Sequence, residues 1–151
     1  MENLEEKYMK RAIELAKQAE TYGEIPVGAV VVLNGQIIGE GFNKRELKLD
    51  ISSHAEIEAL KDAEKRIGNW RLDGATIYVT LEPCLMCSGA ILQSRLSKVV
   101  FGSYDDKDGA LVSRYYVYDA PSIHERPLVY GGVLKEECDS LLKGFFSNKR
   151  K

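Results

Sequence analysis

Helical and extended hydrophobic patterns alternate along this chain. Apolar residues recur at helical spacing over residues 4–19, which predicts an amphipathic first helix. A β-branched apolar run over 27–33 and a second run over 36–41 flank Asn34-Gly35, a dipeptide typical of tight hairpin turns. The N-terminal part is therefore predicted to form a helix followed by a β-hairpin.

The middle of the chain continues with helices and strands in turn. The predicted elements are a helix from Ser53 to about Ile67, a buried strand over 75–81, a helix from Pro83 to near Arg95, and a short strand over 99–101.

The pattern is weaker toward the C-terminus. Residues 105–109 read as a polar loop, and the aromatic-rich segment 114–118 suits a strand or a helix equally well. A short last strand is predicted over 128–130 and a helix from 134 to about 146. This order predicts an α/β protein with a mixed sheet covered by helices on both faces, and residues 1–151 are expected to form a single domain.

Composition narrows the functional classes. The chain has 151 residues, of which 44% are hydrophobic and 29% charged, so extensive disorder is not expected. It shows neither a secretory signal nor an apolar run of bilayer length, so we expect a cytoplasmic protein without membrane association. The net charge of −2 gives no global basic field, although basic residues cluster at 44–48 and in the tail 149–151. A small RNA footprint is compatible with this balance.

Two short motifs carry candidate metal ligands. The first is His54-Ala55-Glu56 and the second is Pro83-Cys84-Leu85-Met86-Cys87. Positions i and i+3 share one side of a helix, so both sulfurs can reach the same ion. Together with the imidazole they would leave a tetrahedral zinc one open position, where bound water loses a proton near neutral pH. Glu56 is then the candidate proton shuttle, and the spacing fits the H-x-E…P-C-x-x-C pattern of zinc nucleobase deaminases.

Each motif also has a plainer interpretation. Thioredoxin-like redox pairs and buried hydrophobic cysteines share the C-x-x-C spacing. Ser53-x-x-Glu56 matches a capping box, in which the carboxylate bonds a backbone N–H and performs no chemistry. Cys138 is expected in the core, but it or His124 would close the metal site as a fourth ligand and make the zinc structural. The combination of both motifs favours the open, catalytic site.

These residues lie in a chain that resembles the bacterial tRNA-specific adenosine deaminases, the TadA family of the cytidine-deaminase-like superfamily. The resemblance runs from about Tyr8 to Tyr104 and resumes from Gly132 to Phe146. Its carriers are E-I-P-V-G-A-V at 24–30, G-E-G-F-N at 39–43, H-A-E at 54–56, Y-V-T-L-E-P-C-L-M-C at 78–87, V-V-F-G at 99–102 and L-L-x-x-F-F at 141–146. The first segment and the T-L-E-P-C-x-M-C wording favour the tRNA branch over free-guanine deaminases, whose first segment more often reads G-P-F-G-A-V.

The resemblance implies a three-layer α/β/α cytidine-deaminase-like fold with a central mixed sheet of about five strands. It also implies a homodimer, one zinc ion per chain, and deamination of adenosine to inosine at the wobble position of a tRNA anticodon loop. Carried over by position, the zinc ligands are His54, Cys84 and Cys87, and Glu56 moves protons.

The resemblance also implies a set of substrate contacts. Asn43 would hydrogen-bond the flipped base, Ala55 would contribute a backbone contact, and Val27 would form an apolar wall. Asp105 corresponds to a residue near the nucleotide before the target, and Phe145 to one near the anticodon-loop surface.

Residues 107–130 depart from the family pattern. V-S-R-Y at 112–115 stands where the family usually has Gly-Ser followed by Leu-Met, and His124-Glu125 stands where it has Asn-His. The tyrosines at 115, 116 and 118 suit base stacking, core packing or dimer contacts.

This departure keeps the substrate open, because the segment lies where the family meets RNA. One alternative is a deaminase of a free purine base or nucleoside, such as guanine or adenine. Another is a non-catalytic, zinc-stabilised RNA-binding module, which would need a fourth protein ligand on the metal.

Overall fold

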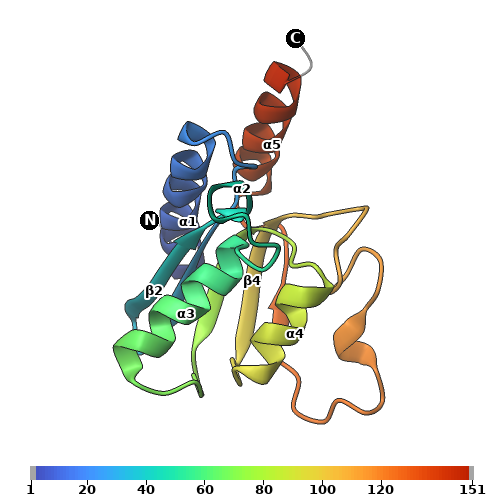
Figure 1. Cartoon of the computed structure of the whole chain (residues 1–151). Helices are drawn as coiled ribbons and strands as arrows, with labels where there is room; N and C mark the ends of the chain where they lie inside the picture. The colour runs from blue at the N-terminus through green and yellow to red at the C-terminus, as the bar shows by residue number, and fades with distance from the viewer. Residues whose placement is uncertain (1–2, 150–151) are drawn as a thin grey trace.

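The computed structural model describes residues 3–149, so the last two residues of the basic tail lie outside the described part (Figure 1). Its elements are α1 (Leu4–Thr21), β1 (Gly28–Leu33), β2 (Gln36–Phe42), α2 (Arg45–Lys48), α3 (Ala55–Ile67), β3 (Thr76–Leu81), α4 (Leu85–Gln93), β4 (Lys98–Ser103), the 3-10 turn η1 (Val117–Asp119), β5 (Leu128–Tyr130) and α5 (Lys135–Lys149). None of the helices in this range is long and apolar enough to cross a membrane.

The strands form one mixed sheet in the order β2-β1-β3-β4-β5. β1 pairs antiparallel with both β2 and β3, whereas β3, β4 and β5 run parallel to one another. Parallel neighbours need a crossover connection, and α4 provides it between β3 and β4. The predicted five-stranded mixed sheet is confirmed.

Two hydrophobic cores cover the two faces of the sheet, which makes the fold three-layered. Successive residues of a strand point to opposite faces. Accordingly, Val31 packs with α3 and α4 on one face, and its neighbours Val30 and Val32 pack with α1 and α5 on the other. Figure 1 shows the two pairs of helices on either side of the sheet.

Two glycines of β2 let α3 lie directly on the sheet. A Cβ at Gly39 or Gly41 would overlap the backbone of Ala59, in the middle of α3. Because His54 precedes α3, this close packing also fixes where the imidazole emerges above the sheet.

The two helices that begin within the motifs, α3 and α4, start later in the chain than predicted. α3 starts at Ala55 with His54 as N-cap, and α4 starts at Leu85 with Cys84 as N-cap, so Pro83 precedes the helix instead of opening it. The capping box is not formed, since the Ser53 N–H donates to the Asp50 carbonyl and the Ser53 hydroxyl has no partner. The short helix α2 was not predicted, and residues 114–118 are mostly irregular, with η1 beginning at residue 117.

Candidate zinc and active site

Three side chains converge where α3 and α4 begin. His54 Nδ1 lies 3.7 Å from Cys84 Sγ and 3.6 Å from Cys87 Sγ, and the three candidate ligand atoms all lie within 4.8 Å of one another. Ideal zinc–sulfur and zinc–nitrogen bonds at a tetrahedral angle place N and S about 3.6 Å apart. The donor set therefore fits one tetrahedral zinc ion without rearrangement.

Two helix N-termini meet at this cluster. His54 is the N-cap of α3 and Cys84 the N-cap of α4, and neither side chain caps its own helix. Both have extended backbone conformations, which leave their side chains free to turn toward each other. The partial positive charge at a helix N-terminus stabilises thiolate sulfur, so α4 favours the ionised form that metals bind.

The two sulfurs differ in their proton affinity. Hydrogen bonds from Cys87 and His54 lower the pKa of Cys84 to about 4, against the opposing effect of burial. The pKa of Cys87 is raised, first by its hydrogen bond to Cys84 and then by burial. The hydrogen bond to Cys84 in turn raises the pKa of His54. Two cysteine sulfurs and one imidazole nitrogen are a donor set that suits zinc.

Neither proposed fourth ligand reaches the cluster. Within residues 3–149, the metal-binding group consists of His54, Cys84 and Cys87 alone. Cys138 packs against Gly102 in the core on the α1 and α5 face, and His124 lies near Leu92 in a separate surface hollow. The site is therefore of the open, three-ligand type that catalytic zinc proteins use.

Glu56 stands in the first turn of α3, two residues after the imidazole ligand. It is 4% exposed, and burial raises the pKa of its carboxyl to about 7. A carboxyl that gains and loses a proton near neutral pH is suited to general acid–base catalysis. The capping box is not formed, so it does not account for the burial of Glu56.

Two members of the cluster, His54 and Cys84, line a small cavity of about 160 Å³. Its lining residues are Ile25, Val27, Asn43, Arg45, His54, Ala55, Glu56, Leu81, Glu82, Cys84, Asp105 and Asp108. A closed cavity of about 150 Å³ holds one benzene ring in another protein, so this space suits a single heterocyclic base with its sugar outside.

The side chain of Asn43 is held by the backbone around it. Its Nδ2 donates to the Ile25 carbonyl at 3.3 Å and its Oδ1 accepts from the Arg45 N–H at 3.2 Å. An asparagine amide has two N–H donors and two oxygen lone pairs. One donor and one lone pair therefore remain for a ligand in the cavity.

The structure brings most of the expected substrate contacts together. Asn43, Val27, Ala55 and Asp105 line the cavity, whereas Phe145 lies buried in α5 and outside the lining. Its expected RNA contact stays a prediction.

Sequence reasoning missed Arg45, Glu82 and Asp108, which also line the cavity. Of these, Arg45 stood in the basic cluster at 44–48 and Asp108 in the polar loop at 105–109. Glu82 stood in the T-L-E-P-C-x-M-C motif that carries the family resemblance, but nothing in the sequence gave it a role.

The tyrosines of the divergent segment separate in the structure. Tyr118 is buried against the core, and its hydroxyl donates to the Ser88 carbonyl of α4 at 2.7 Å. Tyr115 and Tyr116 are exposed. Core packing therefore accounts for Tyr118, while the two exposed rings are available to a partner.

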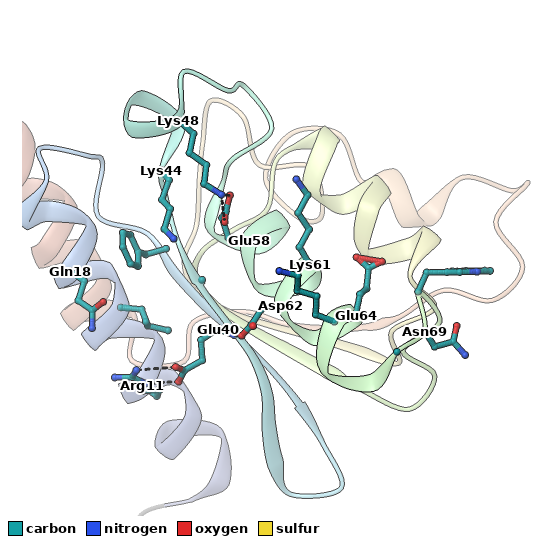
Figure 2. A pocket seen from close by; sticks show the side chains of 16 residues that line it. Arg11, Gln18, Glu40, Lys44, Lys48, Glu58, Lys61, Asp62, Glu64 and Asn69 are labelled. Carbon is teal, nitrogen blue, oxygen red and sulfur yellow. Dashed lines mark hydrogen bonds and ion pairs between the residues drawn. The ribbon is translucent and has the colours of Figure 1, made fainter.

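A wider groove between α1, β2 and α3 has a different character (Figure 2). Ion pairs cross it, with Arg11 Nε 2.6 Å from Glu40 Oε2 and Lys48 Nζ 3.0 Å from Glu58 Oε2. None of the described residues that line it is a histidine or a cysteine. The groove has a volume of about 1020 Å³, but its lining offers no imidazole or thiol, so it is not the zinc site.

Comparison with known proteins agrees with this donor set. Residues 2–103 match the family model of the cytidine and deoxycytidylate deaminase zinc-binding region. The tRNA-specific adenosine deaminase of Bacillus subtilis (strain 168) is 47% identical over 147 residues, covering 97% of this chain and 91% of the relative. That of Haemophilus influenzae (strain ATCC 51907 / DSM 11121 / KW20 / Rd) is 50% identical over 147 residues, covering 97% and 85%. The chain belongs to the tRNA-specific adenosine deaminase family.

The fold and the metal site both agree with this family. A solved structure from a study of A-to-I editing by tRNA:A34 deaminases superposes with a TM-score of 0.87 at 38% identity, covering 90% of this chain and 99% of the other. The three-layer cytidine-deaminase-like fold is confirmed. His54, Cys84 and Cys87 are the zinc-binding site of this family member.

Proposed function

We propose that this chain hydrolyses the 6-amino group of adenosine at the wobble position of a tRNA anticodon loop, producing inosine and ammonia. The observation that carries the proposal is the three-donor metal cluster and the buried Glu56 on the wall of a cavity that suits one base. The tRNA-specific relatives supply the substrate class.

His54, Cys84 and Cys87 would hold the zinc ion. When bound, zinc supplies Lewis-acid activation that brings the pKa of a water molecule close to neutrality. The carboxylate of Glu56 would take up one proton of the attacking water and deliver it to N1 of adenine. As the water oxygen bonds to C6 and the C6–N6 bond breaks, Glu56 would pass the second proton of that water to the amino group, which leaves as ammonia. These proton transfers need one carboxyl with access to both partners. Two carboxylates lie in the first turn of α3, and of these Glu56 lines the cavity, whereas Glu58 lines the wider groove and pairs with Lys48.

Three further residues would hold the base. Asn43 has one N–H and one lone pair left after its backbone contacts, and an asparagine amide can address a purine edge with that pair. Val27 offers an apolar wall, and Ala55 a backbone group beside the zinc ligand. We infer these roles as base contacts from the family resemblance and from the position of the three residues in the cavity lining.

The rim of the cavity suits the rest of an RNA loop. Bases in such loops are partly unstacked, which lowers the cost of flipping one into a pocket. Arg45 lines the cavity next to Lys44 and Lys48, so positive charge lies where phosphates would approach. Asp105 also lines the cavity. We infer from the family resemblance that Asp105 lies near the nucleotide before the target and Phe145 near the anticodon-loop surface.

A homodimer is part of this proposal. Leu49 and Ile51 are 89% and 81% exposed just before His54, and Leu85 and Met86 are exposed just after Cys84. Exposed apolar side chains thus flank both zinc-binding turns, and large exposed apolar side chains are expected at a protein interface. Analytical ultracentrifugation tests the dimer, and a monomer at micromolar concentration would reject it. The cytoplasmic location stays a prediction.

The substrate is tested by incubating the zinc-loaded protein with an adenosine-34 anticodon stem-loop and, separately, with adenine, guanine, adenosine and cytidine. We expect inosine at the wobble nucleotide and no ammonia from the free compounds. Ammonia from the free compounds alone would reject the tRNA substrate in favour of a free-purine deaminase. A stem-loop with guanosine at the wobble position is the matched control.

A further inference from the structure

Five hydrogen-bond donors converge on Glu82, the residue between β3 and the zinc-binding turn. Oε2 accepts from the N–H groups of Leu111, Val112 and Ser113 at 3.1, 2.8 and 3.0 Å. Oε1 accepts from the Asp105 N–H at 3.2 Å and from the Ser113 hydroxyl. The residue is only 2% exposed, so water does not compete for these contacts.

The loop that supplies the donors is close-packed on the turn. A Cβ at Gly109 would overlap the Glu82 carboxylate, so the chain passes directly over it. Beside this contact, the Ala110 N–H donates to the Pro83 carbonyl at 2.9 Å. Residues 82 and 83 therefore bind the loop, and the next residue is the zinc ligand Cys84.

The same loop forms one rim of the cavity. Asp105 and Asp108 line it, and Asp105 Oδ1 accepts from the N–H groups of Lys107 and Asp108, which shapes the turn between them. The loop belongs to the connection 104–127 between β4 and β5, which has no strand of its own among the described residues. Long connections of this kind can adopt several conformations, and the hydrogen bonds to Glu82 favour one of them.

The donor set requires a carboxylate at position 82. Every group that faces it is an N–H or an O–H, and an ionised carboxylate is acceptor-only on both oxygens. An amide NH₂ in place of Oε1 would face the Asp105 N–H and leave it unpaired, and one in place of Oε2 would do the same to three N–H groups.

We propose that Glu82 is a positioning residue that clamps the loop 105–113 to the zinc-binding turn. The clamp sets the distance between the RNA-facing rim and the reacting centre. This inference rests on the proposed function, because the rim matters only if a polynucleotide crosses it.

The test is Glu82→Gln in the zinc-loaded protein, assayed on the adenosine-34 stem-loop. The substitution weakens hydrogen bonds to a charged carboxylate, and the free energy of one such bond corresponds to roughly a tenfold change in affinity. We therefore expect KM to rise roughly tenfold, with kcat within about twofold of the wild type. The zinc content is expected to stay the same. A fall in kcat at unchanged KM would overturn the positioning role.

Two further variants keep the result interpretable. Glu40→Gln changes another hydrogen-bonded carboxylate, the partner of Arg11 in Figure 2, and is expected to leave KM unchanged. Ser113→Ala removes one donor far along the chain from Cys84, and we expect a smaller rise in KM in the same direction. If Glu82→Gln loses zinc or fails to fold, an unchanged KM in Ser113→Ala contradicts the proposal.

Amide hydrogen exchange of the peptide spanning 105–113 provides a readout without turnover. Faster exchange in Glu82→Gln, with other peptides unchanged, is expected if the clamp holds the loop; wild-type exchange would overturn it. An inactive wild-type protein would reject the proposed function, while this exchange experiment still decides whether the clamp exists.

Discussion

Replacing Glu56 by glutamine tests the proposed proton carrier with the least change in shape. The amide fills the same volume but cannot take up and release a proton. General acid–base groups contribute roughly 10²–10⁴-fold to rates. Because Glu56 is 4% exposed, bulk water is a poor substitute, and we expect the upper part of that range, about 10³–10⁴-fold in kcat. This corresponds to about 4–5 kcal/mol in the activation barrier.

The assay compares single-turnover conversion of an adenosine-34 stem-loop by both proteins at equal zinc content. Burial disfavours a charged carboxylate at this position, so the neutral amide is not expected to lower the Tm. A rate equal to that of the wild type would refute the role of Glu56. Joint loss of zinc and activity would also refute it, because the residue would then support the metal instead of moving protons.

Three further substitutions probe the metal, the packing of α3 and the divergent segment. Cys87→Ser is expected to lose zinc and activity together, whereas Cys138→Ser, at the other buried cysteine, keeps both; metal analysis distinguishes them. Gly41→Val places a side chain against the α3 backbone and is expected to lower the free energy of unfolding by about 1–3 kcal/mol, while Gly144→Ala in open space on α5 does not lower it; urea titration checks this. Tyr118→Phe removes the bond to the Ser88 carbonyl and is expected to cost about 0.5–1.5 kcal/mol of stability in the same titration, with stem-loop activity retained. An unchanged stability would speak against a structural role for that hydroxyl.

The sheet was predictable because its strands separate two cores. Adjacent residues such as Val30 and Val31 face different helices, so β1 reads as a continuous apolar run bounded by turn residues. The parallel strands β3 and β4 carry the same signature for the same reason. Helix α2 has only four residues, which is too short for hydrophobic periodicity to appear.

The metal ligands were predictable because zinc restricts both residue type and spacing. The helix starts were less so: as N-caps, His54 and Cys84 turn their side chains to each other, whereas pattern reasoning placed them within the first turn. Glu82 escaped prediction because its partners lie 23–31 residues further along the chain. Only the folded return of that loop brings the donors to the carboxylate.

Zinc K-edge X-ray absorption on the purified protein tests the central claim most directly. Three protein ligands and an open position predict two sulfur atoms at about 2.3 Å and two nitrogen or oxygen atoms at about 2.0–2.1 Å, of which one is an imidazole. A third sulfur or a second imidazole, from Cys138 or His124, would mean a closed structural site. That result would contradict catalysis at this centre.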